Sequence, residues 1–465
     1  MACAGQAKYR PYSAYKPSGV DWLGDIPEGW KRSYLGFECS VKARLGWKGL
    51  KADEYVDDGF IFLATPNIKN DAIDFENVNY ITEKRYAESP EIALKVGDVL
   101  VTKDGSTTGT SNVIRSLPRP ATVNSSIAVL RSDGALNSVF LYYFFLSDFT
   151  QSVINRVRGG MGVPHLFQAD LRKFDLLLPP LPEQRKIAAF LDYETAKIDT
   201  LIAKQERLIA LLDEKRQAVI SHAVTKGLNP DAPLRASGID WLGDVPAHWE
   251  VCRLGSLFTE SNRRANTADE LARPILSVSI HHGISDKELD DDELDRKVIR
   301  SEDRSLYKAV SENDLAYNMM RAWQGGFGAS TLDGLVSPAY VVCAPSSDRP
   351  SSYFELVLRT PNAVTELKRF SRGITDFRLR LYWDEFKNIF VPVPPREEVE
   401  TILKDIAKAS QRHNSLKTRA QSMITLLKER RTALISAAVT GKIDVRDWQP
   451  SNDSSDQDTD QKAFA

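Results

Sequence analysis

The sequence predicts an α+β protein with an internal tandem repeat, in which each copy holds a mixed α/β domain followed by one long helix. Two duplicated segments and one repeated periodicity support this fold class. Residues 18–36 return as 237–255 with eleven of nineteen positions identical, and residues 211–225 return as 426–440 with ten of fifteen identical. Around the second pair, apolar residues recur at spacings of three and four, which is typical of an amphipathic helix. We therefore expect one structural plan, used twice with pseudo-twofold symmetry.

The chain begins with a polar, tyrosine-rich extension, residues 1–17, and continues into the first copy of the 19-residue segment. The tryptophans Trp22 and Trp30 of this copy return as Trp241 and Trp249, and a proline precedes the second tryptophan each time. Large aromatic side chains beside a fixed turn favour anchoring of the start of a domain over an aromatic ligand-binding box. We call the two copies the straps and expect each to seat its domain.

The first body, which follows the first strap, alternates short apolar runs with turn residues. The runs at 60–68, 97–105 and 124–132 are bounded by Gly, Pro, Asn or Asp and read as strands. Residues 138–157 are rich in aromatics and predict a buried helix, and 171–179 predict a last strand. This order indicates a mixed α+β body.

The second body repeats that order with little sequence in common. Strands are expected within 273–280, 312–326, 337–345 and 386–394, and a helix within 352–370. The offset between copies is 219 at the straps but 213 where PPLPEQ aligns with PVPPRE, so the bodies differ in length. Similar frames around dissimilar bodies indicate one scaffold that presents two different recognition surfaces.

Each copy ends in a long helix, expected at 182–228 and 395–443. Pro182 suits the first helical turn, where a missing N–H costs nothing, and Gly227 supplies a stop. A helix of this length with a single apolar stripe requires a partner, and the chain supplies one. The apolar residues expected to form this coiled-coil seam or to contact other subunits are Ile187, Leu191, Ile198, Leu201, Leu208, Leu212, Ile402, Ile406, Leu416, Met423, Leu427 and Leu434.

The composition is that of an ordinary globular protein: 42% hydrophobic and 27% charged residues, with a net charge of −2. The four cysteines have no paired spacing, which favours free thiols in a reducing cytosol over a zinc site. We find no signal peptide, membrane-length apolar run, phosphate loop, glycine-rich cofactor loop or catalytic constellation. The sequence therefore predicts a cytoplasmic protein with no catalytic residues, no metal site and no membrane partner.

Loops at matching positions in the two copies carry residues suited to DNA. KDGSTTG at 103–109 and MRAWQGGFG at 320–328 each follow an expected strand, and RVRGG at 156–160 and KRFSRG at 368–373 each follow the helix of a body. Hydroxyls and backbone amides suit phosphates, and Arg and Gln suit base edges. Any one loop could be a plain hairpin tip or helix end, but their repetition favours nucleic-acid binding. The candidate DNA-binding residues are Lys103, Ser106, Thr107, Thr108, Arg156, Arg158, Arg321, Trp323, Gln324, Arg369, Arg372 and Arg378.

Taken together, these segments resemble a known family. The junctions LPPLPEQRKIAAFLD (178–192) and VPVPPREEVETILKD (391–405), the straps, the GDVLVTKDG segment and the two long helices resemble the specificity subunit of type I restriction–modification enzymes. The resemblance runs from about residue 18 to residue 445. The second junction departs from the pattern, with Arg396–Glu398 where the first has Glu183–Arg185, which could alter subunit contacts but not the helix.

The resemblance implies two target-recognition domains separated by two long antiparallel coiled-coil helices, each domain reading one half of an asymmetric, bipartite DNA site. Helices of roughly 66 Å would act as a spacer comparable with two DNA turns. The implied partners are double-stranded DNA, two modification (methyltransferase) subunits and restriction (translocase/nuclease) subunits. S-adenosylmethionine, ATP and Mg²⁺ would belong to those partners, with no cofactor in this chain. The expected division is an extension at 1–17, target-recognition domain 1 at 18–181, spacer helix 1 at 182–228, target-recognition domain 2 at 229–394, spacer helix 2 at 395–443 and a disordered acidic tail at 444–465.

Two other functions are compatible with a long-helix protein of this kind. A coiled-coil adaptor would bind proteins and show no DNA specificity. A single-chain restriction–methylation enzyme would need a methyltransferase domain, for which no stretch of this sequence is left. Salt-dependent, sequence-selective DNA affinity of the assembled complex would exclude the adaptor.

Overall fold

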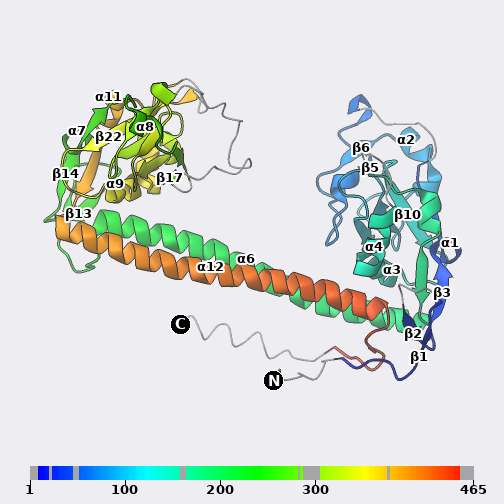
Figure 1. Ribbon diagram of the computed structural model, residues 1–465. Helices are drawn as coiled ribbons and strands as arrows, with labels where there is room; N and C mark the ends of the chain where they lie inside the picture. The colour runs from blue at the N-terminus through cyan, green and yellow to red at the C-terminus, as the bar shows by residue number, and fades with distance from the viewer. Residues whose placement is uncertain are drawn as a thin grey trace. The chain divides into compact units, whose positions relative to one another are not determined.

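The computed structural model divides the chain into two compact units, each of which contains one body and parts of both long helices (Figure 1). The first unit comprises residues 1–205 and 422–465, and the second comprises 206–421. The residues that the structure describes are 9–19, 24–44, 52–157, 164–280, 283–285, 304–373 and 378–450.

The first unit is built on a four-stranded antiparallel sheet in the order β4-β10-β7-β8, with a three-stranded sheet β6-β5-β9 beside it. Buried apolar residues of α3 cover the larger sheet, since Phe140, Phe144 and Phe145 are at most 2% exposed and share a core with Val99 and Val101. The strands are β1 (Tyr15–Pro17), β2 (Asp25–Pro27), β3 (Lys31–Tyr34), β4 (Cys39–Lys42), β5 (Phe60–Leu63), β6 (Asn79–Ile81), β7 (Val99–Thr102), β8 (Ser111–Val113), β9 (Ala121–Val123), β10 (Ile127–Ser132) and β11 (Asp175–Leu178). The helices before α6 are α1 (Leu35–Glu38), η1 (Ala52–Glu54), η2 (Thr65–Asn67), α2 (Glu83–Ala87), η3 (Pro90–Ile92), α3 (Ser138–Leu146), α4 (Asp148–Val157) and α5 (Gln168–Arg172).

The second unit repeats this arrangement, with a four-stranded antiparallel sheet in the order β15-β22-β19-β20. The smaller pairs β16-β17 and β18-β21 stand beside it. Its strands are β12 (Leu234–Ala236), β13 (Asp244–Pro246), β14 (Glu250–Arg253), β15 (Phe258–Ser261), β16 (Ser277–Ser279), β17 (Gly283–Ser285), β18 (Lys308–Val310), β19 (Leu315–Asn318), β20 (Phe327–Ala329), β21 (Gly334–Val336), β22 (Tyr340–Pro345) and β23 (Phe390–Val393). Its helices before α12 are α7 (Leu254–Leu257), α8 (Ala268–Leu271), η4 (Arg304–Leu306), η5 (Ala322–Gln324), α9 (Ser351–Leu358), α10 (Pro361–Phe370) and α11 (Trp383–Phe386).

The predicted α+β class and its two long helices are confirmed. The helix expected at 138–157 is two helices, however, because Ser147 is extended and its hydroxyl oxygen accepts a hydrogen bond from the Thr150 N–H at 3.3 Å. The helix expected at 352–370 divides in the same way at Thr360, whose hydroxyl accepts from the N–H of Ala363. In both bodies, a capping residue within the apolar run thus ends one helix and begins another.

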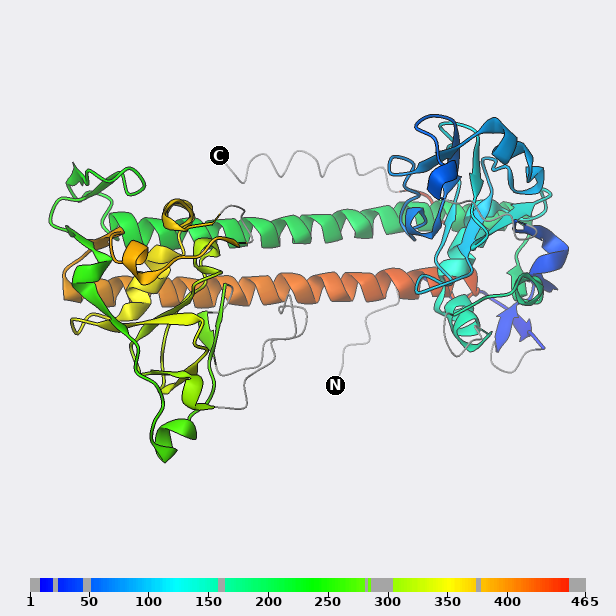
Figure 2. The same cartoon turned by 90° about the horizontal axis from the view of Figure 1, so that it is seen from above.

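The long helices are α6 (Leu181–Lys226) and α12 (Arg396–Val439), each an unbroken ribbon when seen from above (Figure 2). In each unit they are antiparallel, because the end of one helix lies beside the start of the other. A Cβ on Gly441, just past α12, would lie 2.5 Å from Pro27, and one on Gly227, just past α6, would lie 3.1 Å from Glu398 Oε1. Both glycines have a positive φ, of 72° and 78°, which completes the helix end at little cost only in glycine. Among the described residues, these helices and the shorter ones are too polar or too short to cross a membrane.

The predicted helix seam is buried at some positions and partly exposed at others. Ile187 and Leu191 are fully buried in the first core, and Ile402 and Ile406 are buried in the second. Ile198 and Leu427 are also buried, whereas Leu212 and Leu434 are half-buried. Four predicted seam residues are instead 39–48% exposed, namely Leu201, Leu208, Leu416 and Met423. One facing helix alone leaves these side chains partly in water.

Each strap seats its body on the start of a long helix through a buried tryptophan. Trp30 and Trp249 are both 1% exposed, and their indole N–H groups donate to Glu183 at 2.8 Å and to Glu398 at 3.0 Å. A buried indole N–H needs such a partner, and a carboxylate makes the bond charge-assisted. The structural role expected for these tryptophans is therefore confirmed, whereas Trp22 lies outside the described residues.

This pairing corrects the alignment of the two junctions. Glu183 and Glu398 are 215 residues apart, and β11 and β23 share that offset, so the correct offset is 215 rather than 213. The counterpart of Glu183 is thus Glu398 and not Arg396. The next residue, Gln184, is 1% exposed and accepts from the N–H of Asn137 at 2.7 Å, and Val399 replaces it in the second copy.

Both bodies are closed by the same pair of strands. Tyr34 at the end of β3 pairs with Asp175 at the start of β11, and Arg253 pairs with Phe390 in the second unit. The glycine that ends each strap is explained by close packing, because a Cβ on Gly36 would lie 2.9 Å from the Cβ of Arg172.

The described chain stays packed beyond residue 443, where we expected a disordered tail to begin. Val445 is 1% exposed, and the ring of Trp448 packs edge-on against Phe190 with centroids 5.4 Å apart. The N-terminal extension meets this segment, since Asp444 N–H donates to the carbonyl of Arg10 at 2.7 Å. Residues 451–465 lie outside the described part of the chain.

Candidate nucleic-acid interface

The loop expected at 103–109 joins β7 to β8 in the first unit. Gly105 and Gly109 adopt positive φ values of 84° and 93°, and Gly109 N–H donates to the carbonyl of Thr102 at 2.9 Å. A Cβ on Gly109 would lie 3.1 Å from Ile154, so glycine lets the loop pack against α4. This tight turn presents Ser106 and Thr107 to solvent.

Two other candidates in this loop face inward. Lys103 is 7% exposed, and burial lowers the pKa of its ammonium, so this side chain is not a surface cation. The hydroxyl of Thr108 donates to the carbonyl of Gly105 at 2.7 Å and so stabilises the turn. The exposed hydroxyls of Ser106 and Thr107 are therefore the groups of this loop best placed to meet a ligand.

The loop is tied to residues 164–166, which sequence reasoning missed. Leu166 N–H donates to the carbonyl of Lys103 at 2.9 Å, Gly105 N–H donates to that of Pro164 at 3.1 Å, and the His165 ring contacts the Asp104 carboxylate. A pairing between segments about 60 residues apart leaves no local pattern, and no signal in this sequence would have found it.

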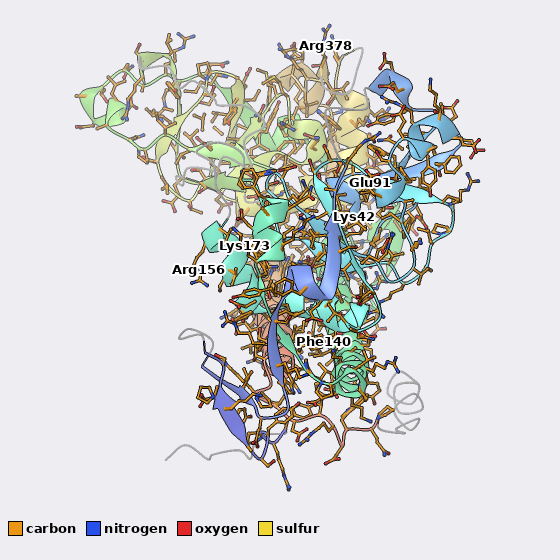
Figure 3. The ribbon with its side chains drawn as sticks, turned by 90° about the vertical axis from the view of Figure 1, so that its right-hand side faces the viewer. Lys42, Glu91, Phe140, Arg156, Lys173 and Arg378 are labelled. Atoms are coloured by element: carbon orange, nitrogen blue, oxygen red, sulfur yellow. The ribbon has the colours of Figure 1, made fainter. Side chains whose placement is uncertain are left out.

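Arg156 lies in the last turn of α4 and is exposed. It lies on the same side of the first unit as Lys173 (Figure 3). Between α4 and α5 there is a surface cavity of about 180 Å³ lined by residues that include Val153, Val157 and Lys173. Arg158 lies outside the described residues, so of the two predicted arginines the structure describes Arg156 alone.

The counterpart loop joins β19 to β20 in the second unit, as the repeat predicted. Its short helix η5 carries Trp323 and Gln324, and Arg321 directly precedes this helix and donates from its guanidinium to Gln324 Oε1 at 3.0 Å. The two glycines are required, since Gly325 has a φ of 88° and a Cβ on Gly326 would lie 2.9 Å from the carbonyl oxygen of Arg321. The loop thus holds its polar side chains in one fixed cluster.

Helix α10 adds cations to this cluster. Lys368 Nζ lies 5.3 Å from the centre of the Trp323 ring, within the range of a cation–π contact. Arg369 is held by two hydrogen bonds to Glu366, at 2.7 and 2.6 Å, which raise its pKa. Trp323 and α10 therefore belong to one surface.

The remaining candidates follow α10. Arg372 forms an ion pair with Glu385 and pairs through its backbone with Arg380, while Arg378 is exposed. Leu381 N–H donates to the carbonyl of Met319 at 3.0 Å, which ties this segment to the start of the 320–328 loop. In each unit, therefore, the candidate loop follows an equivalent strand of the four-stranded sheet, β7 in the first unit and β19 in the second.

Comparisons with known proteins agree with this arrangement. Residues 41–209 match the family model described as type I restriction modification DNA specificity domain. The type I restriction enzyme EcoKI specificity subunit of Escherichia coli strain K12 is 21% identical over 92% of each chain. The EcoBI specificity subunit of E. coli is 24% identical over 72% of this chain and 71% of its own length.

A solved structure shares the fold. A chain from a study of complex assembly and conformational transition of the type I R-M system superposes with a TM-score of 0.63. It has 17% sequence identity and covers 90% of this chain and 99% of its own. These matches confirm the resemblance predicted from the straps and junctions.

Proposed function

Because the chain is similar to type I restriction enzyme specificity subunits over 92% of its length, we propose that it supplies the DNA sequence specificity of a type I restriction–modification complex. The observation that carries this proposal is the double use of one frame. Trp30–Glu183 and Trp249–Glu398 seat the bodies alike, whereas the loops at the ends of equivalent strands differ. One frame with two different reading surfaces suits a site with two different halves.

Each body would read one half of a bipartite, asymmetric site in double-stranded DNA. In the first unit, Ser106 and Thr107 offer exposed hydroxyls that suit phosphates and base edges. In the second, Arg321, Trp323 and Gln324 offer guanidinium, aromatic and amide groups. The two halves would therefore differ in sequence, because the groups that contact them differ.

The two long helices would set the spacing of the half-sites. Helices of 46 and 44 residues are roughly 66–69 Å long, comparable with two turns of DNA. Their partly exposed leucines, including Leu201 and Leu416, offer apolar surface for methyltransferase subunits. Helix length would then determine the gap within the target.

The complex would act in the cytoplasm with two modification subunits and with restriction subunits. S-adenosylmethionine, ATP and Mg²⁺ would be bound by those subunits, with this chain contributing recognition alone. The chain would thus be non-catalytic, and its side chains would act by choosing where the partners work.

The test is co-expression with candidate modification subunits, followed by mapping of methylated adenines across the host genome. A split motif with a fixed gap would support the proposal and would identify both half-sites. A stable purified complex that leaves the genome unmethylated and binds DNA without sequence preference would contradict it and favour a coiled-coil adaptor.

A further inference from the structure

Each unit exposes a large aromatic side chain beside its candidate DNA loop. Phe167 is 56% exposed and Tyr382 is 42% exposed, although the leucine before each of them is fully buried. Single exposed aromatics are common on protein surfaces and need no function. These two stand at one position of a repeat whose bodies otherwise share little sequence, so their exposure calls for a common explanation.

The two positions are equivalent by three separate criteria. They are 215 residues apart, which is also the offset between Glu183 and Glu398. Each directly precedes a short helix, α5 or α11. Each follows a leucine whose N–H donates to the start of a candidate loop: Leu166 to Lys103, the first residue of its loop, at 2.9 Å, and Leu381 to Met319, the residue before its loop, at 3.0 Å.

A basic residue accompanies the aromatic in both units. His165 and Arg380 stand two residues before Phe167 and Tyr382, and extended backbone places residues i and i+2 on the same side. In the first unit the rings of His165 and Phe167 are in edge contact, with centroids 4.2 Å apart. Both units therefore present the order basic residue, buried leucine, exposed aromatic.

This order has the chemistry of a nucleic-acid contact. A ring face packs against a base or a deoxyribose, and a neighbouring side-chain N–H, from Arg380 in one unit or His165 in the other, meets the adjacent phosphate. The buried leucine holds both side chains beside the start of the candidate DNA loop, because its N–H is hydrogen-bonded there. A second possible occupant, a protein subunit, would use the same ring but has no need of the basic neighbour at both positions.

We propose that Phe167 and Tyr382 are DNA-contacting residues, each packing its ring against a base or sugar at the edge of its own half-site. The proposal rests on the proposed function and adds one aromatic contact for each half. Since the contact is apolar, it adds affinity without neutralising a phosphate. Its loss should therefore weaken binding without changing the salt dependence.

The experiment measures binding of the complex with its modification subunits to the site found by methylation mapping, over a series of salt concentrations. Phe167→Ala and Tyr382→Ala should each weaken binding about tenfold, as expected for the loss of one aromatic contact. The slope of log affinity against log salt should stay that of the wild type. Phe167→Tyr and Tyr382→Phe should keep the wild-type affinity, because either aromatic ring can pack against a base or sugar.

Phe37→Ala is the matched control. Phe37 is 79% exposed in the same unit, but its counterpart at the strap offset of 219 is Ser256, so the repeat does not preserve an aromatic there. This variant should bind DNA as the wild type does. Thermal unfolding of all variants should match the wild type, since exposed side chains are removed.

The outcomes separate this proposal from the function on which it rests. If the wild-type complex shows no sequence-selective affinity, the proposed function itself fails. If the wild type is selective and both alanine variants bind as tightly, the aromatic contacts do not exist. If the variants instead lose their modification subunits while the remaining intact complex binds normally, the rings dock protein and the proposal is overturned.

Discussion

The two units differ least where a strap meets a helix and most where a loop ends a strand. Trp30 donates to Glu183 at 2.8 Å and Trp249 donates to Glu398 at 3.0 Å, with both indoles buried. Even the second hydrogen bond to each carboxylate comes from a different side chain, Tyr12 in one unit and His248 in the other. The comparison shows that the repeat preserves the buried tryptophan and its carboxylate partner at each junction, while the second donor to that carboxylate changes.

The largest effect should come from lengthening the two long helices while leaving both bodies intact. Insertion of one or two helical turns between Ile198 and Leu208, with a matching insertion in α12, should widen the gap between half-sites without altering either half. The original site should lose at least about 10³-fold in affinity, the difference between specific and non-specific binding. Methylation mapping of the variant complex checks this. A change of base identity within the halves would contradict the spacer role.

The next largest effect should come from removal of Trp30 or Trp249, the buried strap tryptophans. Trp30→Ala and Trp249→Ala should each lower the free energy of unfolding by about 3–5 kcal/mol, because both side chains are fully enclosed. Urea unfolding monitored by circular dichroism measures the change. Trp30→Phe and Trp249→Phe are the matched variants: they keep most of the apolar packing and lose the hydrogen bond, for a smaller cost of about 1.5–3 kcal/mol. Unequal costs in the two units would show that the frames are not equivalent.

Substitutions among the candidate DNA-binding residues of one unit should affect one half-site and leave the other unchanged. Thr107→Ala in the first unit and Arg372→Ala in the second should each weaken binding and relax sequence preference only in one half-site. A lost base contact is worth about 1–3 kcal/mol. Binding to a set of single-base variants of the target gives the measurement, with Arg446→Ala as an arginine control that pairs with Asp444 in the first unit. A loss spread evenly over all sequences would make either residue a phosphate contact.

The smallest effects should come from ion pairs between the helices. Arg431 Nε lies 2.9 Å from Asp199 in the first unit, and Lys417 Nζ lies 2.8 Å from Asp213 in the second. The carboxylates are about half exposed, so each pair should contribute about 0.2–1 kcal/mol. Asp199→Asn should cost more than Asp213→Asn, because the side chain of Arg431 is 19% exposed and that of Lys417 is 37%. Urea midpoints at low and high salt would test this, and equal midpoints would show that burial of the cation has no effect.

The sequence predicted the elements better than the contacts between them. The duplicated straps and the apolar spacings indicated the two bodies and both long helices, because these features repeat within the chain. The breaks at Ser147 and Thr360 were missed, since a capping hydroxyl inside an apolar run looks like any other polar residue. The junction offset was also wrong, because two prolines align at 213 and two at 215, and only the partners of Trp30 and Trp249 show which carboxylates are equivalent.

The candidate site was predicted less completely. Residue types placed Ser106 and Thr107 on an exposed loop, but they gave no indication that the neighbouring Lys103 is covered. The contact of His165 with Asp104 joins segments 61 residues apart, so only the fold reveals it. Exposure, which singled out Phe167, is likewise a property of the folded chain rather than of its sequence.

The strand pair that closes each body also bears on how such proteins change over generations. The body between residues 34 and 175 leaves and rejoins the frame at paired positions, as does the body between 253 and 390. A gene segment encoding one body could therefore be exchanged by recombination within the flanking strap and junction codons, without a break in the frame. On the proposed function, an exchange of that kind would replace one half of the recognised site and keep the other.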